Sequence, residues 1–262
     1  MKKFLAMLKT DFYRAFFSFG FLLGIISTFV AFWFAVPDMM VRISSAIAGF
    51  HNIYQAGNIN HLLIMTATFA YSASFCTDLQ TRFTYPLIIR NNTALYTFSK
   101  CVATAVSGGL SVAIGALLFI ICACIKQPCI MPPAVEIDLE FSWQAFGDLL
   151  MAGQAGLFFL SYLYIIFLQA AFWALLGLMI SAYQPNKYVA YIVPFILSFM
   201  MNQIANVFKL PIWLDPVKLS TVRIFTTPSS TILLMATATF VSCMLVCTIL
   251  FIYKAKRRIS NG

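Results

Sequence analysis

Few side chains in this 262-residue sequence could bind a metal or act as a nucleophile, because it contains only two histidines and seven cysteines. His51 and His61 are ten residues apart and have no nearby set of Cys, Asp or Glu ligands, so we expect no metal site. The cysteines form no pair of C-x-x-C motifs, and buried cysteines usually behave as small apolar residues. Inert thiols are the favoured interpretation, with a disulfide among Cys122, Cys124 and Cys129 as the alternative.

Acid–base catalysis and nucleotide hydrolysis are disfavoured by what the sequence lacks. The interiors of its long apolar stretches contain no Asp, Glu, Lys or Arg. Membrane-embedded enzymes and ion-coupled carriers need ionisable groups at such depth. The sequence also has no G-x-x-x-x-G-K-[ST] loop for nucleotide phosphates. We therefore expect no catalytic residue and no directly bound cofactor, and any ATPase would be a separate subunit.

The composition indicates the environment in which these side chains lie. Apolar residues make up 61% of the chain and charged residues 10%, and the mean hydropathy is +0.89. Soluble domains have about 45–50% apolar and about 25% charged residues. The composition therefore disfavours a soluble enzyme, a disordered chain and a disulfide scaffold, and it predicts a membrane protein.

The positions of the charges predict where the chain crosses the membrane. Stretches longer than 20 residues without a charge can each hold one span, since a bilayer core needs about 20 apolar residues per helix. The first part of the stretch 43–77 is too polar for hydrocarbon, and 149–186 is slightly too short for two helices and a turn. We predict an all-α polytopic membrane protein with six transmembrane helices at 16–36, 61–78, 101–124, 151–181, 188–208 and 230–252.

Lysine and arginine predict the orientation of these spans. With the N-terminus inside, twelve of the 17 basic residues fall on the inside and five on the outside. We therefore predict that both termini are cytoplasmic and that the protein is a multi-pass protein of the bacterial cytoplasmic membrane. The net charge of +9 is then explained mainly by basic residues that flank the spans and set their orientation. No nucleic-acid partner is expected.

Residues 1–15 are predicted to form an amphipathic helix that lies in the membrane interface, in contact with membrane lipids. Phe4, Leu5, Leu8 and Phe12 share one face, and the basic residues lie largely off it. A basic flank that only assists insertion is the alternative. A cleaved signal peptide is disfavoured, because the apolar run is too long and no small-residue cleavage site follows it.

The segment 78–100, predicted to be cytoplasmic, has an unusual composition for a loop. Aromatic and apolar side chains are dense between 83 and 89, and charged residues flank them. Such a patch is typical of a contact with another protein, and packing on the protein's own helix ends is the alternative. A polar turn, Asn91-Asn92-Thr93, precedes the third span, and Thr93 could cap that helix through its hydroxyl.

The chain resembles the membrane subunit of type-2 ABC exporters. The whole layout carries the resemblance: a basic amphipathic entry helix, six spans, both ends inside, and a second-to-third-span loop of this form. Within and beside the loop, the matching residues are Phe75, Asp78, the Asn-Asn-Thr turn, Tyr96 and the Ser99-Lys100 pair. The chain departs from the family pattern at Arg82, where a glycine is common, and at Ala94, where a basic residue is common.

The resemblance implies that residues 1–262 form a single permease domain in which 79–99 is the cytoplasmic coupling loop. It also implies that a dimer of ABC ATPase subunits, which would bind ATP and Mg²⁺, docks on this loop. A second permease subunit, identical or different, would complete the translocation path. The residues expected to couple to the ATPase are Asp78, Gln80, Arg82, Phe83, Tyr85, Pro86, Leu87 and Arg90.

Two further features bear on the expected path. The predicted extracellular segment 209–229 is half apolar but carries four charges, so it is either a re-entrant hairpin or an interfacial loop. The resemblance favours the re-entrant form. Polar and aromatic side chains in the fourth and fifth spans are candidates to line the path, and contacts between helices are the alternative role. These candidates are Gln154, Tyr162, Gln169, Asn202, Gln203 and Asn206.

Two other classes of function stay open beside the exporter. One is an ATP-independent channel or secondary carrier, and the other is a membrane enzyme. Both are disfavoured by the lack of ionisable groups in the span interiors. The sequence leaves the substrate open among peptide-like, drug-like and lipid-like molecules.

Overall fold

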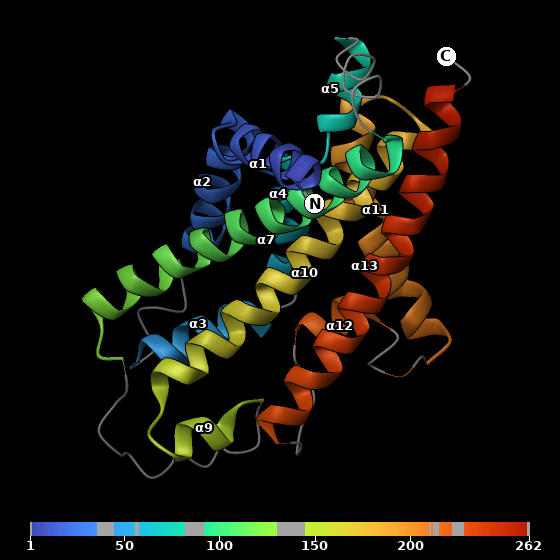
Figure 1. Cartoon of the computed structure of the whole chain (residues 1–262). Helices are drawn as coiled ribbons and strands as arrows, with labels where there is room; N and C mark the ends of the chain where they lie inside the picture. The colour runs from blue at the N-terminus through green and yellow to red at the C-terminus, as the bar shows by residue number, and fades with distance from the viewer. Residues whose placement is uncertain are drawn as a thin grey trace.

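Long apolar helices make up most of the chain in the computed structural model (Figure 1). The structure describes residues 2–35, 45–55, 58–81, 92–129, 145–209, 211, 215–221 and 228–260, and these residues contain no β-strand. Five segments are long and apolar enough to cross a membrane, and a bent pair of helices makes up to six. The prediction of an all-α chain with several apolar helices of membrane-spanning length is confirmed, and this architecture is consistent with a polytopic membrane protein. The five segments are Ile59–Gln80, Thr93–Lys126, Ala155–Tyr183, Lys187–Val207 and Ser229–Ile259.

The N-terminal part of the chain forms the bent pair, α1 (Lys2–Phe16) and α2 (Phe19–Phe34). The two helices meet at 51°, and Ser18 caps α2 by accepting a hydrogen bond from the backbone N–H of Phe21 at 3.1 Å. A helix was predicted over 1–15 with its apolar face towards lipid, and α1 covers residues 2–16. Leu5 is exposed, whereas Asp11 is buried, because α1 packs against a neighbouring helix rather than against lipid alone.

The second predicted span is interrupted. It begins with α4 (Asn58–Phe69), turns at 70–73 and ends with α5 (Ser74–Gln80). Before it lies α3 (Ala46–Gln55), a mostly buried helix in a stretch where the sequence predicted no element. Its polar residues had suggested a segment outside hydrocarbon, and Asn52 is exposed, but His51 is buried beside the rings of Phe158 and Tyr162.

The third span, α7 (Thr93–Lys126), has 34 residues and is about 51 Å long at 1.5 Å per residue. It begins eight residues before the predicted start. Its N-cap is Asn92, whose side-chain oxygen accepts a hydrogen bond from the backbone N–H of Ala94 at 3.1 Å. The expectation that Thr93 caps this helix is therefore wrong, because Thr93 already lies in the first turn.

The remaining helices complete the bundle. A short helix, α9 (Gly147–Met151), precedes α10 (Ala155–Tyr183), and the turn between them contains Gly153 with a φ of +71°. This turn moves the start of the fourth span to 155 from the predicted 151. The chain then forms α11 (Lys187–Val207), α12 (Pro216–Ser220) and α13 (Ser229–Ser260).

Helix α10 lies at the centre and packs on α4, α7, α11 and α13. Close approach of the backbones depends on glycine at several positions. A Cβ added to Gly108 of α7 would lie 2.3 Å from the Cβ of Ala174 in α10. A Cβ on Gly20 would lie 2.2 Å from the carbonyl oxygen of Phe69. These helices are therefore in direct backbone contact at the two glycines.

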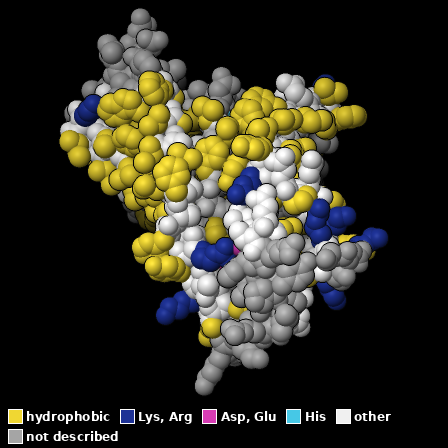
Figure 2. Space-filling view, turned by 90° about the horizontal axis from the view of Figure 1, so that it is seen from above, with side chains coloured by type: hydrophobic (Ala, Val, Ile, Leu, Met, Phe, Trp, Pro, Cys, Tyr) yellow, Lys and Arg dark blue, Asp and Glu magenta, His cyan; other side chains and the backbone are white. Residues whose placement is uncertain are grey.

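The two ends of the molecule differ. The C-terminal end of α13 lies at the same end as α5, whereas α3 and α9 lie at the other (Figure 1). Seen from the α5 end, the surface shows Lys and Arg side chains in several places, with large hydrophobic areas beside them (Figure 2). Arg257 and Arg258 in the last turn of α13 contribute to this charge.

Candidate functional site

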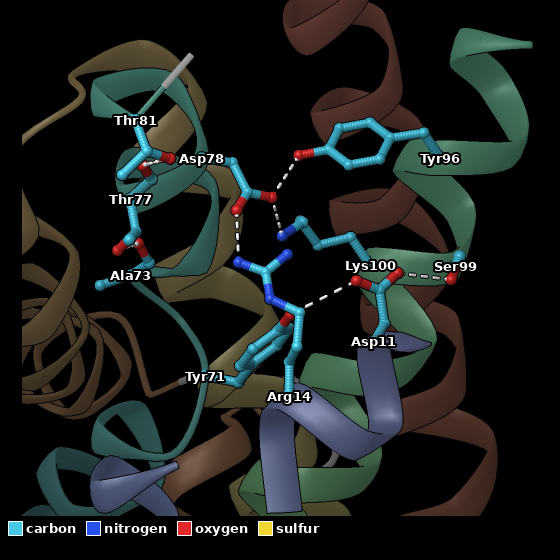
Figure 3. Close-up of polar contacts among 10 residues, drawn as sticks. All are labelled: Asp11, Arg14, Tyr71, Ala73, Thr77, Asp78, Thr81, Tyr96, Ser99 and Lys100. Carbon is cyan, nitrogen blue, oxygen red and sulfur yellow. Dashed lines mark hydrogen bonds and ion pairs between the residues drawn. The ribbon is translucent and has the colours of Figure 1, made fainter. Parts of the chain in front are cut away.

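A buried cluster of charged and polar side chains joins three helical segments at the α5 end of the molecule (Figure 3). Helix α1, the broken second span and the first two turns of α7 each contribute to it. We call this set the ion-pair cluster. Its members are Asp11, Arg14, Tyr71, Asp78, Tyr96, Ser99 and Lys100.

Asp78 is the centre of the cluster and is fully buried. One carboxylate oxygen accepts a hydrogen bond from the guanidinium of Arg14 at 2.7 Å. The other accepts one from the hydroxyl of Tyr96 at 2.7 Å and pairs with the ammonium of Lys100. Three helical segments therefore converge on a single carboxylate, and both of its oxygens are occupied.

Lys100 has no exposed surface, although its position in the sequence suggested a charge flanking the third span. Because α7 begins at Thr93, Lys100 lies two turns inside the helix. Its ammonium lies 5.1 Å from the centre of the Tyr71 ring and 5.4 Å from that of Tyr96, within the range of a cation–π contact. Asp78 and these two rings surround the buried cation.

Asp11 ties α1 to the same place. Its carboxylate accepts hydrogen bonds from the Ser99 hydroxyl at 2.6 Å and from the Tyr71 hydroxyl at 3.3 Å, and only 5% of the residue is exposed. The two carboxylates and the two cations of the cluster balance in charge. A buried ion pair of this kind is tolerated only when further hydrogen bonds satisfy it, as they do here.

Four of the residues that carried the family resemblance lie in the cluster: Asp78, Tyr96, Ser99 and Lys100. Phe75 is buried nearby, with its ring 5.3 Å from that of Phe251. Among the expected coupling residues, Asp78 is thus turned inward, and Gln80 is exposed. The other expected coupling residues lie outside the described part of the chain: Arg82, Phe83, Tyr85, Pro86, Leu87 and Arg90.

Sequence reasoning missed Asp11, Arg14 and Tyr71 as partners of Asp78. The available signal was Asp11, which is the only acidic residue among the first 37 positions. Its spacing of four residues from Met7 and Ala15 places all three on one face of α1, and all three are buried. An acid on the buried face of a basic helix indicates a buried polar partner.

The candidate path residues do not form one surface. Tyr162 and Gln169 are buried and are linked through Tyr54, whose hydroxyl lies 3.4 Å from the side-chain oxygen of Gln169. The ring centres of Tyr54 and Tyr162 are 5.5 Å apart. The others lie on the surface or are half-buried: Gln154 before α10, and Asn202, Gln203 and Asn206 on α11.

The segment 209–229 is described in part. Helix α12 is capped by Asp215, whose carboxylate accepts a hydrogen bond from the backbone N–H of Val217 at 3.0 Å. The hydroxyl of Tyr54 in α3 donates to the carbonyl oxygen of Ser220 at 2.9 Å. This short helix is therefore joined to the core, while 210, 212–214 and 222–227 lie outside the described residues.

The two histidines are far from forming a common site. His61 is hydrogen-bonded to the Ser198 hydroxyl at 2.7 Å and stacks on Phe199. His51 is buried among aromatic rings, and this burial lowers its pKa to about 4. Within the described ranges, no group of three or more His, Cys, Asp or Glu side chains could hold a metal ion.

The sequence matches no protein-family model, and no curated protein matches it. Function is therefore inferred from the geometry of the ion-pair cluster and from the arrangement of the spans. The cluster is buried except for Arg14, whose side chain is 31% exposed, and its charges are paired, so it is suited to fixing helices together. The two ends of the undescribed segment 82–91 both adjoin the cluster, since Asp78 lies just before it and Tyr96 just after it.

Proposed function

We propose that the chain is the permease subunit of an ATP-driven ABC exporter and forms half of a dimeric path for a peptide-like, drug-like or lipid-like substrate. A dimer of separate ATPase subunits docks on the segment 78–90 and supplies ATP and Mg²⁺. The chain itself hydrolyses nothing. The second permease subunit, identical or different, contributes the other half of the path.

The ion-pair cluster is the observation that carries this proposal. Asp78 pairs with Arg14 of α1 and with Lys100 of α7, so the helix that begins the docking segment is fixed both to the N-terminal helix and to the helix that follows the segment. A displacement of the segment would therefore move three helical elements together. This linkage is what a permease needs to convert closure of an ATPase dimer into a movement of its spans.

The proposed orientation follows from the charged end of the molecule. We place the α5 end in the bacterial cytoplasm, because that end carries Lys and Arg (Figure 2) and cytoplasmic loops are enriched in both. Six spans, with the bent pair as the first, return the C-terminus to the N-terminal side. Helix α1 then lies in the cytoplasmic interface, and the re-entrant segment 209–229 lies outside.

The path itself is proposed to involve the apolar outer faces of α11 and α13. In each of these two helices, only 22% of the most apolar 18-residue stretch is buried within the chain. Lipid or the second permease subunit would cover the rest. Asn202, Gln203 and Asn206 lie on α11, where neutral amides prefer helix contacts or a water-lined route. We assign them to the path at the interface between subunits.

Co-purification and crosslinking test the proposal. A photo-crosslinking residue at position 82 or 85 is expected to capture an ATPase encoded by a neighbouring gene, whereas the same residue at Ala152, at the opposite end, is expected to capture none. ATP hydrolysis should co-purify with the complex and be absent from the isolated chain. Intrinsic ATPase activity of the chain, or absence of crosslinks from 82 and 85, would contradict it.

The alternative is an ATP-independent channel or secondary carrier. Buried charges lie nearer the span interiors than the sequence indicated, since Asp78 and Lys100 belong to the second and third candidate spans. A carrier could use such a carboxylate to bind a proton. Against this, both oxygens of Asp78 already have partners. Transport that tracks a proton gradient and persists without ATP would favour the carrier.

A further inference from the structure

The C-terminal end of α7 brings two cysteines into contact. Cys124 belongs to the last turn of this helix, and Cys129 lies three residues beyond its final residue, Lys126. Their thiols are hydrogen-bonded to each other, and both thiols are free in the structure. A disulfide forms only between cysteines whose side chains point towards each other, and this contact meets that condition.

Backbone hydrogen bonds fix the path of the chain between the two cysteines. The N–H of Gln127 donates to the carbonyl oxygen of Ala123 at 2.9 Å, which closes the last turn of α7. The carbonyl oxygen of Pro128 accepts a hydrogen bond from the N–H of Ala46, at the start of α3, at 3.1 Å. The ring of this proline also restricts its own φ. The second cysteine is therefore held beside the first by an anchored segment of backbone.

The other cysteines of α7 do not compete for this pair. Cys122 precedes Cys124 by two residues, and two residues turn an α-helix by about 200°. The side chains of these two cysteines therefore point to opposite sides of α7. Cys101 lies about 35 Å from Cys124 along the helix axis, at about 1.5 Å per residue. Of the cysteines in α7, Cys129 can therefore pair only with Cys124.

The exposure of the pair permits a reaction with an external oxidant. Cys129 is exposed, whereas Cys124 is half-buried. An exposed thiol can attack a disulfide of another molecule, and a neighbouring thiol can then complete the exchange. In the proposed orientation this end of α7 lies outside the cytoplasm, where disulfides form and persist. A disulfide here depends on that orientation and not on an ATPase partner.

We propose that Cys124 and Cys129 form a disulfide in the mature protein. The thiolate of Cys129 attacks one sulfur of a disulfide carried by an extracytoplasmic thiol oxidase, and the first thiol of the oxidase leaves. The thiolate of Cys124 then attacks the Cys129 sulfur of this mixed disulfide, and the second thiol leaves. Two electrons pass from the pair to the oxidase disulfide, and the two thiol protons end on its two sulfurs. One S–S bond forms and one is broken.

The disulfide would close a ring of six residues, 124–129, at the end of the third span. Pro128 lies within this ring and is hydrogen-bonded to Ala46. The covalent link would therefore hold the end of α7 to the start of α3 as well as to the segment that follows it.

Tryptic peptides of the full-length protein test the proposed disulfide. Intact cells are first treated with N-ethylmaleimide, which alkylates free thiols and prevents later oxidation. Trypsin cleaves after Lys126, and Cys129 is the only cysteine of the fragment 127–187. Without reductant, mass spectrometry is expected to find this fragment linked to the fragment 101–126, with Cys129 not alkylated. Dithiothreitol should separate the two fragments.

Two variants identify the partner of Cys129. Cys124→Ser is expected to abolish the link between the fragments and to leave Cys129 alkylated. Cys122→Ser is the matched control, because it removes a thiol of the same helix end that faces away from the pair. The control is expected to retain the linked fragments as the wild type does.

Two outcomes would overturn the proposal. Alkylation of Cys129 in the wild type would show that the pair is reduced in the cell. Linked fragments in Cys124→Ser would assign the disulfide to another cysteine. Labelling of Cys129 as the only cysteine with a membrane-impermeant maleimide reports the orientation separately. A reduced pair together with labelling from outside would exclude the disulfide and leave the orientation standing.

Discussion

Lys100 and Asp78 show how much one buried charge depends on its partners. Each would be strongly unfavourable alone in the interior of the protein. Together with Arg14 and Tyr96 they are satisfied. A buried pair adds little net stability compared with apolar residues, but removing one member leaves the other charge uncompensated. The cluster therefore matters more for fixing the geometry than for adding stability.

Lys100→Met is expected to lower the free energy of unfolding by about 3–5 kcal/mol, because the buried cluster is left with two carboxylates and only one cation, Arg14. Denaturant unfolding in detergent measures the effect. Lys218→Met is the comparison variant, since the side chain of Lys218 is 30% exposed and its ammonium lies 3.8 Å from the buried Asp215, too far for a hydrogen bond, so a smaller loss is expected. An equal decrease in the free energy of unfolding in the two variants would show that the buried position of Lys100 does not increase its contribution to stability.

His51 gives the protein a pH dependence that can be assigned to one residue. Burial lowers its pKa from 6.5 to about 4, so the unfolded chain binds a proton more readily than the folded one between these values. Stability is therefore complete above pH 6.5 and falls as the pH decreases towards 4, by up to about 1.4 kcal/mol per pH unit. His51→Phe should flatten this slope in unfolding measurements between pH 7.5 and 4.5. An unchanged slope would assign the loss to other groups.

At the scale of the elements, helix spacing is set by backbone contact at particular glycines. Gly108 is one such position in α7, since a methyl group there would lie 2.3 Å from Ala174 in α10. Gly156, near the start of α10, has nothing within 4 Å of its added Cβ. The same substitution should therefore have opposite consequences at these two helical sites.

Gly108→Ala is expected to destabilise the protein by about 1–3 kcal/mol, because overpacking forces α7 and α10 apart. Gly156→Ala should be neutral or stabilising by up to about 1 kcal/mol, since alanine favours helix more than glycine does. Thermal unfolding of both variants in the same detergent compares them directly. A loss at Gly156 as large as that at Gly108 would mean that the close contact is not the cause.

The sequence was informative about long apolar helices and less so about where they break. Charge-free stretches indicated the approximate positions of the spans, because hydrocarbon excludes charge. The turn at 70–73 carries no charge or proline to mark it. Helix α3 was missed because its polar residues argued against a span, whereas aromatic rings of α10 shield His51 and the apolar residues of the helix are buried. Asp78 and Lys100 were identified as notable, but their pairing depends on how far α7 extends and on contacts between distant segments.

At the scale of the whole molecule, the two ends are predicted to face different compartments. Native Cys129 is exposed just beyond α7, and exposed Lys256 lies near the end of α13. In a variant with Cys129 as its only cysteine, a membrane-impermeant maleimide should label intact cells. With Lys256→Cys as the only cysteine, labelling should require permeabilised cells. Labelling of both positions from the same side would contradict the proposed orientation.

The ion-pair cluster also imposes an order on the synthesis of the protein. Asp11 and Arg14 leave the ribosome first, Asp78 follows and Lys100 comes last. A buried charge that lacks its partner is strongly unfavourable. A nascent chain that ends before α7 contains two carboxylates of the cluster, Asp11 and Asp78, but only one of its two cations, Arg14. We therefore expect α1, α5 and α7 to reach their final arrangement only after Lys100 has been synthesised, since the charges of the cluster balance only from that point.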